Sequence, residues 1–127
     1  MQERSLYEYA VIRVVARVER EEFLNVGVVL YAASTKFLQV RYTVCEAKLI
    51  LIAPQLEISE TAEHLAAFER IAKGDTTAGP IAFLPAPERF RWLTAVRSTI
   101  VQTSKVHTGF CRDYEEEAER LFGLLVL

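Results

Sequence analysis

Residues 6–18 alternate between two sets of side chains, and this pattern limits the fold more than any other feature of the sequence. A period of two places successive side chains on opposite faces of an extended chain, whereas a helix needs a period near 3.6. The first set is apolar and consists of Leu6, Ala10, Ile12, Val14, Ala16 and Val18. The second set contains Tyr7, Tyr9, Arg13 and Arg17. The pattern predicts a long, half-buried strand.

Two further segments alternate in the same way. Residues 23–32 follow the polar run 19–22, and residues 36–44 follow Ala33-Ser34-Thr35, so the three segments predict an antiparallel meander. One face of this sheet is predicted to be apolar core. The other face collects Tyr9, Arg13, Asn25, Tyr31, Gln39 and Arg41. This second face either lies under a helix or binds another molecule.

Helical signals occupy the middle and the end of the chain. Residues 47–53 are compatible with a short helix, and Ser59 is a plausible N-cap for a helix over 60–73 that stops at Gly74. Residues 75–87 indicate a loop that packs on the domain, and residues 88–96 are compatible with a helix. Asp113 and Glu116 have capping-box spacing, so we expect a closing amphipathic helix after Asp113.

β-branched and alternating residues at 98–103 and 106–111 predict two more strands, joined by a tight turn at Ser104-Lys105. Such a hairpin would pair Gln102 with His107 and bring Arg97 close to His107. The predicted fold is α+β: a mainly antiparallel sheet, made of an N-terminal three-strand meander and a C-terminal hairpin, packed with two or three helices. A chain of 127 residues, 51% of them hydrophobic, is expected to form a single domain over 1–127.

The charge balance argues against several classes of partner. The formal net charge is -2, which supplies little attraction for a phosphate backbone, so nucleic acid is an unlikely partner. Neither a secretory signal nor a stretch of membrane-spanning length is recognised, and we expect a cytoplasmic protein. Cys45 and Cys111 lack paired spacing, which favours two reduced thiols over a disulfide.

Three stretches together resemble a bacterial family. They are Tyr9-Ala-Val-Ile-Arg13, Glu22-Phe-Leu-Asn-Val-Gly-Val-Val-Leu30, and Arg89-Phe-Arg-Trp-Leu93 leading to Arg97-Ser-Thr99, Val101-Gln102 and Val106-His-Thr-Gly109. The chain is similar, nearly end to end, to the family catalogued as domain of unknown function 3037. The resemblance implies no activity. Relatives are often encoded beside HipA-like kinases, which implies an accessory or antitoxin-like role with such a kinase as a protein partner.

The densest group of hydrogen-bond donors lies in the C-terminal half. It consists of Arg91, Arg97, Ser98, Thr99, Gln102, Ser104, His107 and Thr108. Two arginines among hydroxyls suit a phosphate or carboxylate, although the same pattern is expected of strand residues that face water. His107 is the best candidate for proton transfer, because it is the histidine flanked by hydroxyl-bearing and basic residues. His64 reads as a partly buried structural residue on the Phe68 side of its helix.

Other chemistry is weakly indicated. Cys45, Cys111, His64 and His107 have none of the short paired spacings of a metal site, so neither a metal nor a cofactor is predicted. No dinucleotide or Walker-type phosphate loop occurs. Gly27, within Asn25-Val-Gly27, either lets a ligand or another backbone approach closely or marks a bulge.

These observations favour a non-catalytic accessory domain that binds a protein partner. Its contact would be either the face with Arg13 and Asn25 or the segment with Arg97 and His107. The alternative is a small enzyme, or a nucleotide- or anion-binding module, that uses Arg97 and His107. The sequence specifies no oligomeric state.

Overall fold

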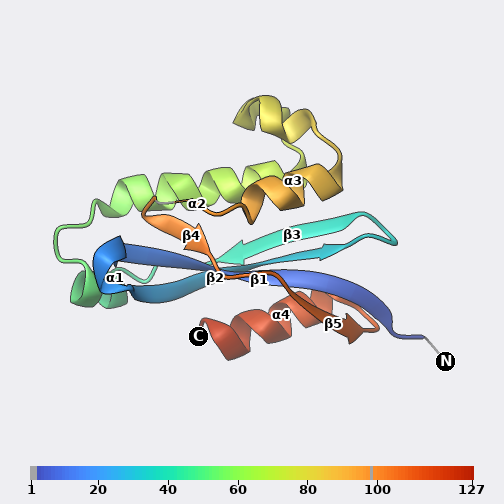
Figure 1. Cartoon of the computed structure of the whole chain (residues 1–127), viewed down its shortest axis with the longest axis horizontal. Coiled ribbons are helices and arrows are strands. Elements are labelled where there is room, and N and C mark those ends of the chain that lie inside the picture. The colour runs from blue at the N-terminus through green and yellow to red at the C-terminus, as the bar shows by residue number, and fades with distance from the viewer. Residues whose placement is uncertain (1–2, 98) are drawn as a thin grey trace.

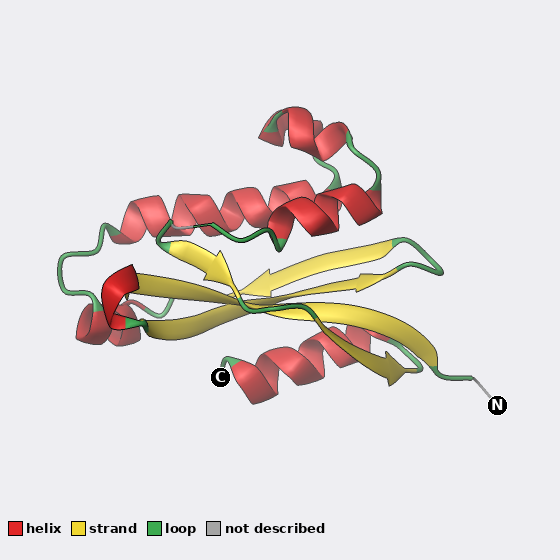
Figure 2. Cartoon of the chain, viewed as in Figure 1, coloured by secondary structure: helices red, strands yellow, loops and turns green. Residues whose placement is uncertain are grey.

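The computed structural model describes residues 3–97 and 99–127, in which a five-stranded antiparallel sheet carries helices on both faces (Figures 1 and 2). The strands are β1 (Ser5–Arg17), β2 (Glu22–Ala32), β3 (Phe37–Tyr42), β4 (Val101–Thr103) and β5 (His107–Cys111). The α-helices are α1 (Glu46–Ile52), α2 (Ile58–Lys73), α3 (Ala86–Leu93) and α4 (Tyr114–Leu125). Short 3-10 turns are η1 (Val18–Arg20), η2 (Thr76–Ala78) and η3 (Pro80–Phe83). The predicted α+β class is confirmed. The described residues form four α-helices where two or three were predicted, because both segments that the sequence left open, 47–53 and 88–96, contribute short helices.

The N-terminal meander is confirmed. Strand β2 lies between β1 and β3, and both pairs are antiparallel.

The loop predicted over 75–87 contains η2 and η3, and Ala82 within it is buried, so this loop packs on the domain.

The predicted C-terminal hairpin is wrong. Strand β4 pairs with β1 at 12–14, and β5 pairs with β1 at 5–9, so the two short strands follow one another along the same edge of β1. Ser104 joins them: its backbone N donates to the carbonyl O of Val11 (2.8 Å), and its Oγ accepts from Val11 N (2.9 Å). The long free edge of β1 offers both segments backbone partners, and the predicted pairing of Gln102 with His107 does not form.

The upper layer in Figure 1 is made by α2 and α3. Ile12 and Val40 are buried beneath it, and α2 contributes Leu65 and Phe68 to the same core. The helix ends at Gly74, whose φ of 71° is the left-handed conformation expected of a C-cap glycine. The predicted N-cap at Ser59 is wrong, because α2 begins at Ile58, a residue that packs against the core, and Glu57 precedes it.

The lower layer is α4, which covers the second face of the sheet (Figure 1). Its N-cap is confirmed, since Asp113 Oδ1 accepts from Glu116 N at 3.0 Å. Ala118 and Leu121 pack with Tyr7, Val28 and Leu30 in a second core. The face that the sequence left open therefore lies partly under a helix.

A β-bulge explains which residues change faces. The β1–β2 register passes from Ile12 opposite Gly27 to Arg13 opposite Asn25, so Val26 is skipped. Val28 is buried but faces α4. Tyr31, predicted for the second face, lies in the upper core, 5.1 Å from the Phe90 ring. In the described part of the chain, no helix is long and apolar enough to cross a membrane.

Candidate functional site

Three polar residues from three neighbouring strands form a row across the sheet. Arg13 on β1 stands directly opposite Asn25 on β2 and Gln102 on β4. Residues directly opposite each other in antiparallel strands project from the same face. We call Asn25, Arg13 and Gln102 the Arg13 row. The sequence placed Arg13 and Asn25 in one cluster and Gln102 in another, and the sheet brings the three together.

Arg13 has unusual surroundings for a cation. Its guanidinium lies over the ring of Phe23, with Cζ 3.9 Å from the ring centroid. Its Nε is buried and has no hydrogen-bond partner among the described residues, which also provide no ion pair for this side chain. Burial lowers the pKa of the Arg13 guanidinium. A partly desolvated cation without a counter-charge is destabilising, so a ligand that brings an acceptor would be favoured here.

Asn25 fixes the row at the carboxyl end of α4. Its Nδ2 donates to the carbonyl O of Leu125 in the last turn of that helix, at 3.1 Å. Its Oδ1 is buried and accepts no hydrogen bond among residues 3–97 and 99–127. The row thus combines an unpaired buried acceptor with an unpaired buried donor, on residues directly opposite each other.

Gln102 and Thr99 are tied to their own segment. Gln102 Nε2 donates to the carbonyl O of Thr99 at 2.8 Å, and Thr99 Oγ1 donates to the carbonyl O of Val101 at 2.8 Å. These bonds hold the entry to β4 and orient the Gln102 amide beside Arg13. Phe23, 45% exposed, completes the surface on the other side of Arg13.

The expected approach of Arg97 to His107 is wrong. Arg97 donates to the carbonyl O of Trp92 and stacks with Cζ 4.7 Å from the Trp92 ring and 5.2 Å from the ring of Phe68, in the upper layer. His107 stands opposite Tyr9, with ring centroids 5.3 Å apart, on the α4 face. The sheet separates the two residues because β4 and β5 do not form a hairpin.

The remaining predicted site residues are dispersed. Arg91 is exposed on α3, and Thr108 is exposed on β5. Ser98 lies outside the described residues. The structure therefore does not assemble a donor cluster from Arg91, Arg97, Thr99 and Thr108.

His64 is the residue that Arg97 does approach. The His64 ring packs edge-on against Phe68 at 5.4 Å, as its position in the helix predicted. Burial, and after it the charge of Arg97, lower the pKa of His64. His64 borders a cleft of about 400 Å³ that is also lined by Glu57 and Glu60, so the cleft is unsuited to anions.

A second polar network, which the sequence did not predict, joins α4 to β1. Tyr7 donates to Glu117 Oε2, and Arg120 binds both oxygens of the same carboxylate at 2.8 Å. The hydrogen bond from Arg120 lowers the pKa of Glu117, and burial raises that of Tyr7. Only the i, i+3 spacing of Glu117 and Arg120 is visible in the sequence, because Tyr7 lies 110 residues away. Because its groups are paired with one another, we interpret this network as a structural link between α4 and β1.

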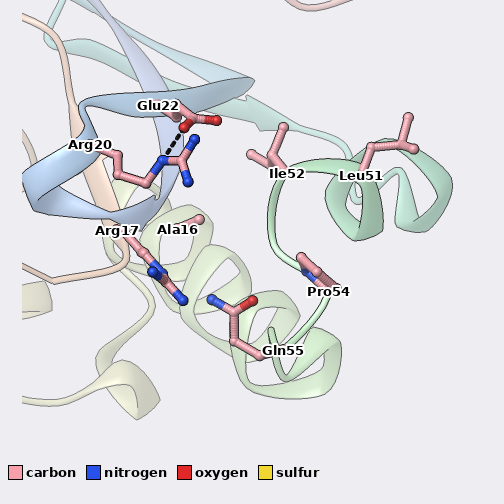
Figure 3. A pocket seen from close by; sticks show the side chains of 8 residues that line it. All are labelled: Ala16, Arg17, Arg20, Glu22, Leu51, Ile52, Pro54 and Gln55. Carbon is pink, nitrogen blue, oxygen red and sulfur yellow. Dashed lines mark ion pairs between the residues drawn. The ribbon is translucent and has the colours of Figure 1, made fainter.

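Figure 3 shows a cavity of about 310 Å³ between the end of the β1–β2 hairpin and the segment after α1. Arg17 and Gln55 extend toward each other across it, while Arg20 forms an ion pair with Glu22. Leu51 on its rim is 83% exposed. An open cavity in which one of two arginines is already neutralised is a weaker anion site than the Arg13 row.

The described part of the chain contains no cluster of metal ligands and no cluster of reactive thiols. No group of three or more His, Cys, Asp or Glu side chains is placed to hold a metal ion there. Cys45 and Cys111 are free thiols. Burial raises the pKa of the Cys111 thiol, which makes it a poor nucleophile at neutral pH.

The structure at Gly27 shows both features that its sequence position predicted, a close approach of another backbone and a bulge. A Cβ at Gly27 would lie 2.5 Å from the backbone O of Arg41, so another strand does approach closely, and the bulge at Val26 is adjacent. No ligand space is needed to explain this glycine.

Comparison with known proteins identifies a family. The sequence model of a family described as "Protein of unknown function (DUF3037)" matches residues 9–126. No curated protein and no solved structure matches the chain.

Proposed function

Because the chain belongs to the DUF3037 family, whose description assigns no activity, we propose a function from the site itself: an accessory protein that binds a protein partner through the Arg13 row and Phe23. The observation that carries the proposal is Arg13, a half-buried cation with no ionic partner in the described chain.

The expected contact on the partner is a carboxylate. A guanidinium presents a planar fork of donors that matches a carboxylate, and its stacking on an aromatic ring pre-organises the fork. An aspartate or glutamate of the partner would supply the counter-charge that the half-buried Arg13 guanidinium lacks. Phe23 would add apolar contact at the rim.

A HipA-like kinase is the partner that we propose to test first. The family resemblance suggests this kinase as a genomic neighbour, and the accessory role follows from it. The proposal places both proteins in the cytoplasm, where the free thiols of Cys45 and Cys111 would remain reduced.

We predict that Arg13→Met weakens this complex at least tenfold, which is about 1.4 kcal/mol. Methionine keeps apolar contact with Phe23 but removes the charge and its donors. Titration calorimetry of the purified chain with a purified HipA-like kinase measures the change. Thermal melts of both variants show whether the fold is retained.

Arg91→Met is the matched control, because Arg91 is an exposed arginine on α3, in the opposite layer. It should bind as the unmodified chain does. Equal binding by the Arg13→Met and unmodified chains would reject the Arg13 row as the contact. Equal weakening by both arginine variants would show a nonspecific effect of net charge.

The enzyme and anion-binding alternative has less support. It requires Arg97 and His107 in one site, and these residues lie on opposite faces of the sheet. Arg97 already donates a hydrogen bond to the carbonyl O of Trp92, so fewer of its donors remain for a ligand.

A further inference from the structure

Strand β5 forms an outer edge of the sheet. It pairs with β1 on one side, and no second strand pairs with it in the part of the chain that the structure describes. Figure 1 shows β5 running along the N-terminal half of β1 at the margin of the molecule. A strand edge of this kind presents unpaired backbone N–H and C=O groups.

The two edges of the sheet differ in their protection against pairing. Strand β3, at the opposite edge, carries Arg41, which is hydrogen-bonded to Gln39 and lies 3.8 Å from Glu115. The β5 sequence, His107–Cys111, contains no lysine, arginine, carboxylate or proline. Charged residues and prolines are the usual means by which edge strands avoid pairing.

Exposed apolar side chains accompany this unprotected edge. Leu6 stands directly opposite Phe110, and the two are 52% and 62% exposed. Val106, which immediately precedes β5, is 39% exposed. A strand added beside β5 would cover part of this apolar surface.

We propose that two copies of the chain pair antiparallel through β5, about a twofold axis at Thr108. This places Phe110 opposite Val106 of the partner subunit, and Thr108 opposite Thr108 of the partner subunit. Both are favourable cross-strand pairs. The inference does not rest on the proposed function, because the Arg13 row takes no part in it.

The sequence around Thr108 is self-complementary in this register. His107 would face Gly109 of the partner subunit, a position where the Tyr7 ring occupies the space that a side chain would take. Lys105 would face Cys111 of the partner subunit, and no two like charges stand opposite each other over 104–112. An isologous interface needs this match of a surface patch with itself.

Sedimentation equilibrium tests the proposal. We expect the unmodified chain to dimerise with rising concentration, and Thr108→Lys to weaken the dimer at least tenfold, because its two ammonium groups meet on the axis. Thr108 is exposed, so the monomer should keep its fold. Thr35→Lys, at an exposed threonine of the β2–β3 turn, is the matched control and should dimerise normally.

Disulfide trapping tests the register separately. Under mild oxidation, Thr108→Cys should form a covalent dimer, because opposed residues of antiparallel strands are close enough for a disulfide. Phe110→Cys should not, since its counterpart lies several residues away across the axis. Preferential cross-linking of Phe110→Cys would overturn this register.

Two other results would overturn the proposal. A chain that stays monomeric at millimolar concentration would reject self-pairing. The partner of the β5 edge would then have to be a strand of another protein. A dimer that persists undiminished in Thr108→Lys would place the interface elsewhere.

Discussion

Gly109 shows how one residue can determine a neighbour's position. It stands opposite Tyr7 in the sheet, and a Cβ added at Gly109 would lie 2.6 Å from the Tyr7 hydroxyl oxygen. The absent side chain lets the Tyr7 ring lie across β5 and reach Glu117. Tyr7 is buried, so it has little room to give way.

We predict that Gly109→Ala lowers the free energy of unfolding by about 2 kcal/mol, the cost of overpacking a core position. Gly123→Ala is the control: apart from its chain neighbours and its own helix backbone, no atom lies within 4 Å of its added Cβ, and alanine in a helix should raise stability by about 0.5–1 kcal/mol. Urea unfolding measures both. An unchanged free energy of unfolding in Gly109→Ala would mean that Tyr7 moves aside freely.

Among elements, α4 and β1 are joined by a carboxylate that two donors share. Arg120 and Tyr7 both donate to Glu117, and the Arg120 bond is the main cause of its lowered pKa. The folded-state pKa lies below the ordinary value of 4.5, so the unfolded chain takes up the proton first as pH falls. The stability due to Glu117 is therefore present above about pH 4.5 and is lost as the pH falls through the folded-state value.

We predict that Glu117→Gln makes the loss of stability between pH 5 and pH 3 less steep than in the unmodified chain. Urea unfolding at a series of pH values measures the slope. Glu119→Gln, at an exposed residue with no ion pair in the described chain, should leave the slope unchanged. Parallel slopes for Glu117→Gln and the unmodified chain would contradict the role given to this carboxylate.

The placement of β4 and β5 is also decided among elements. Both segments have strand-forming sequences, and the tight turn between them is a reasonable expectation from residue types alone. Their pairing depends on which free edge is within reach, and β1 offers one along most of its length. Ser104 then bridges to Val11 where the two short strands meet.

In the whole molecule, one sheet separates two cores. Leu65 lies in the core between the sheet and the helices α2 and α3, and Leu121 lies in the core between the sheet and α4. Both cores use side chains from β1 and β2, so losing either one should destabilise the strands that support the other.

We therefore predict that Leu65→Ala and Leu121→Ala each lower the free energy of unfolding by about 2–5 kcal/mol, with one shared transition. Urea unfolding followed by far-UV circular dichroism and by tryptophan fluorescence provides two probes. Coincident curves with an unchanged m-value would support the single domain that the sequence predicts. Two separated transitions in either variant would contradict it.

The sequence by itself determined the α+β class, the three-strand meander, the α2 and α4 helices and the caps at Gly74 and Asp113. These follow from side-chain period and from local hydrogen bonding, which act over a few residues. The tertiary structure alone decided the edge that β4 and β5 join, the bulge at Val26 and the assembly of the Arg13 row. Each depends on backbone groups that lie far apart in the chain, so no local pattern records it. The surroundings of Arg13 belong to this second kind, because Phe23, Asn25 and Gln102 reach it only through strand register.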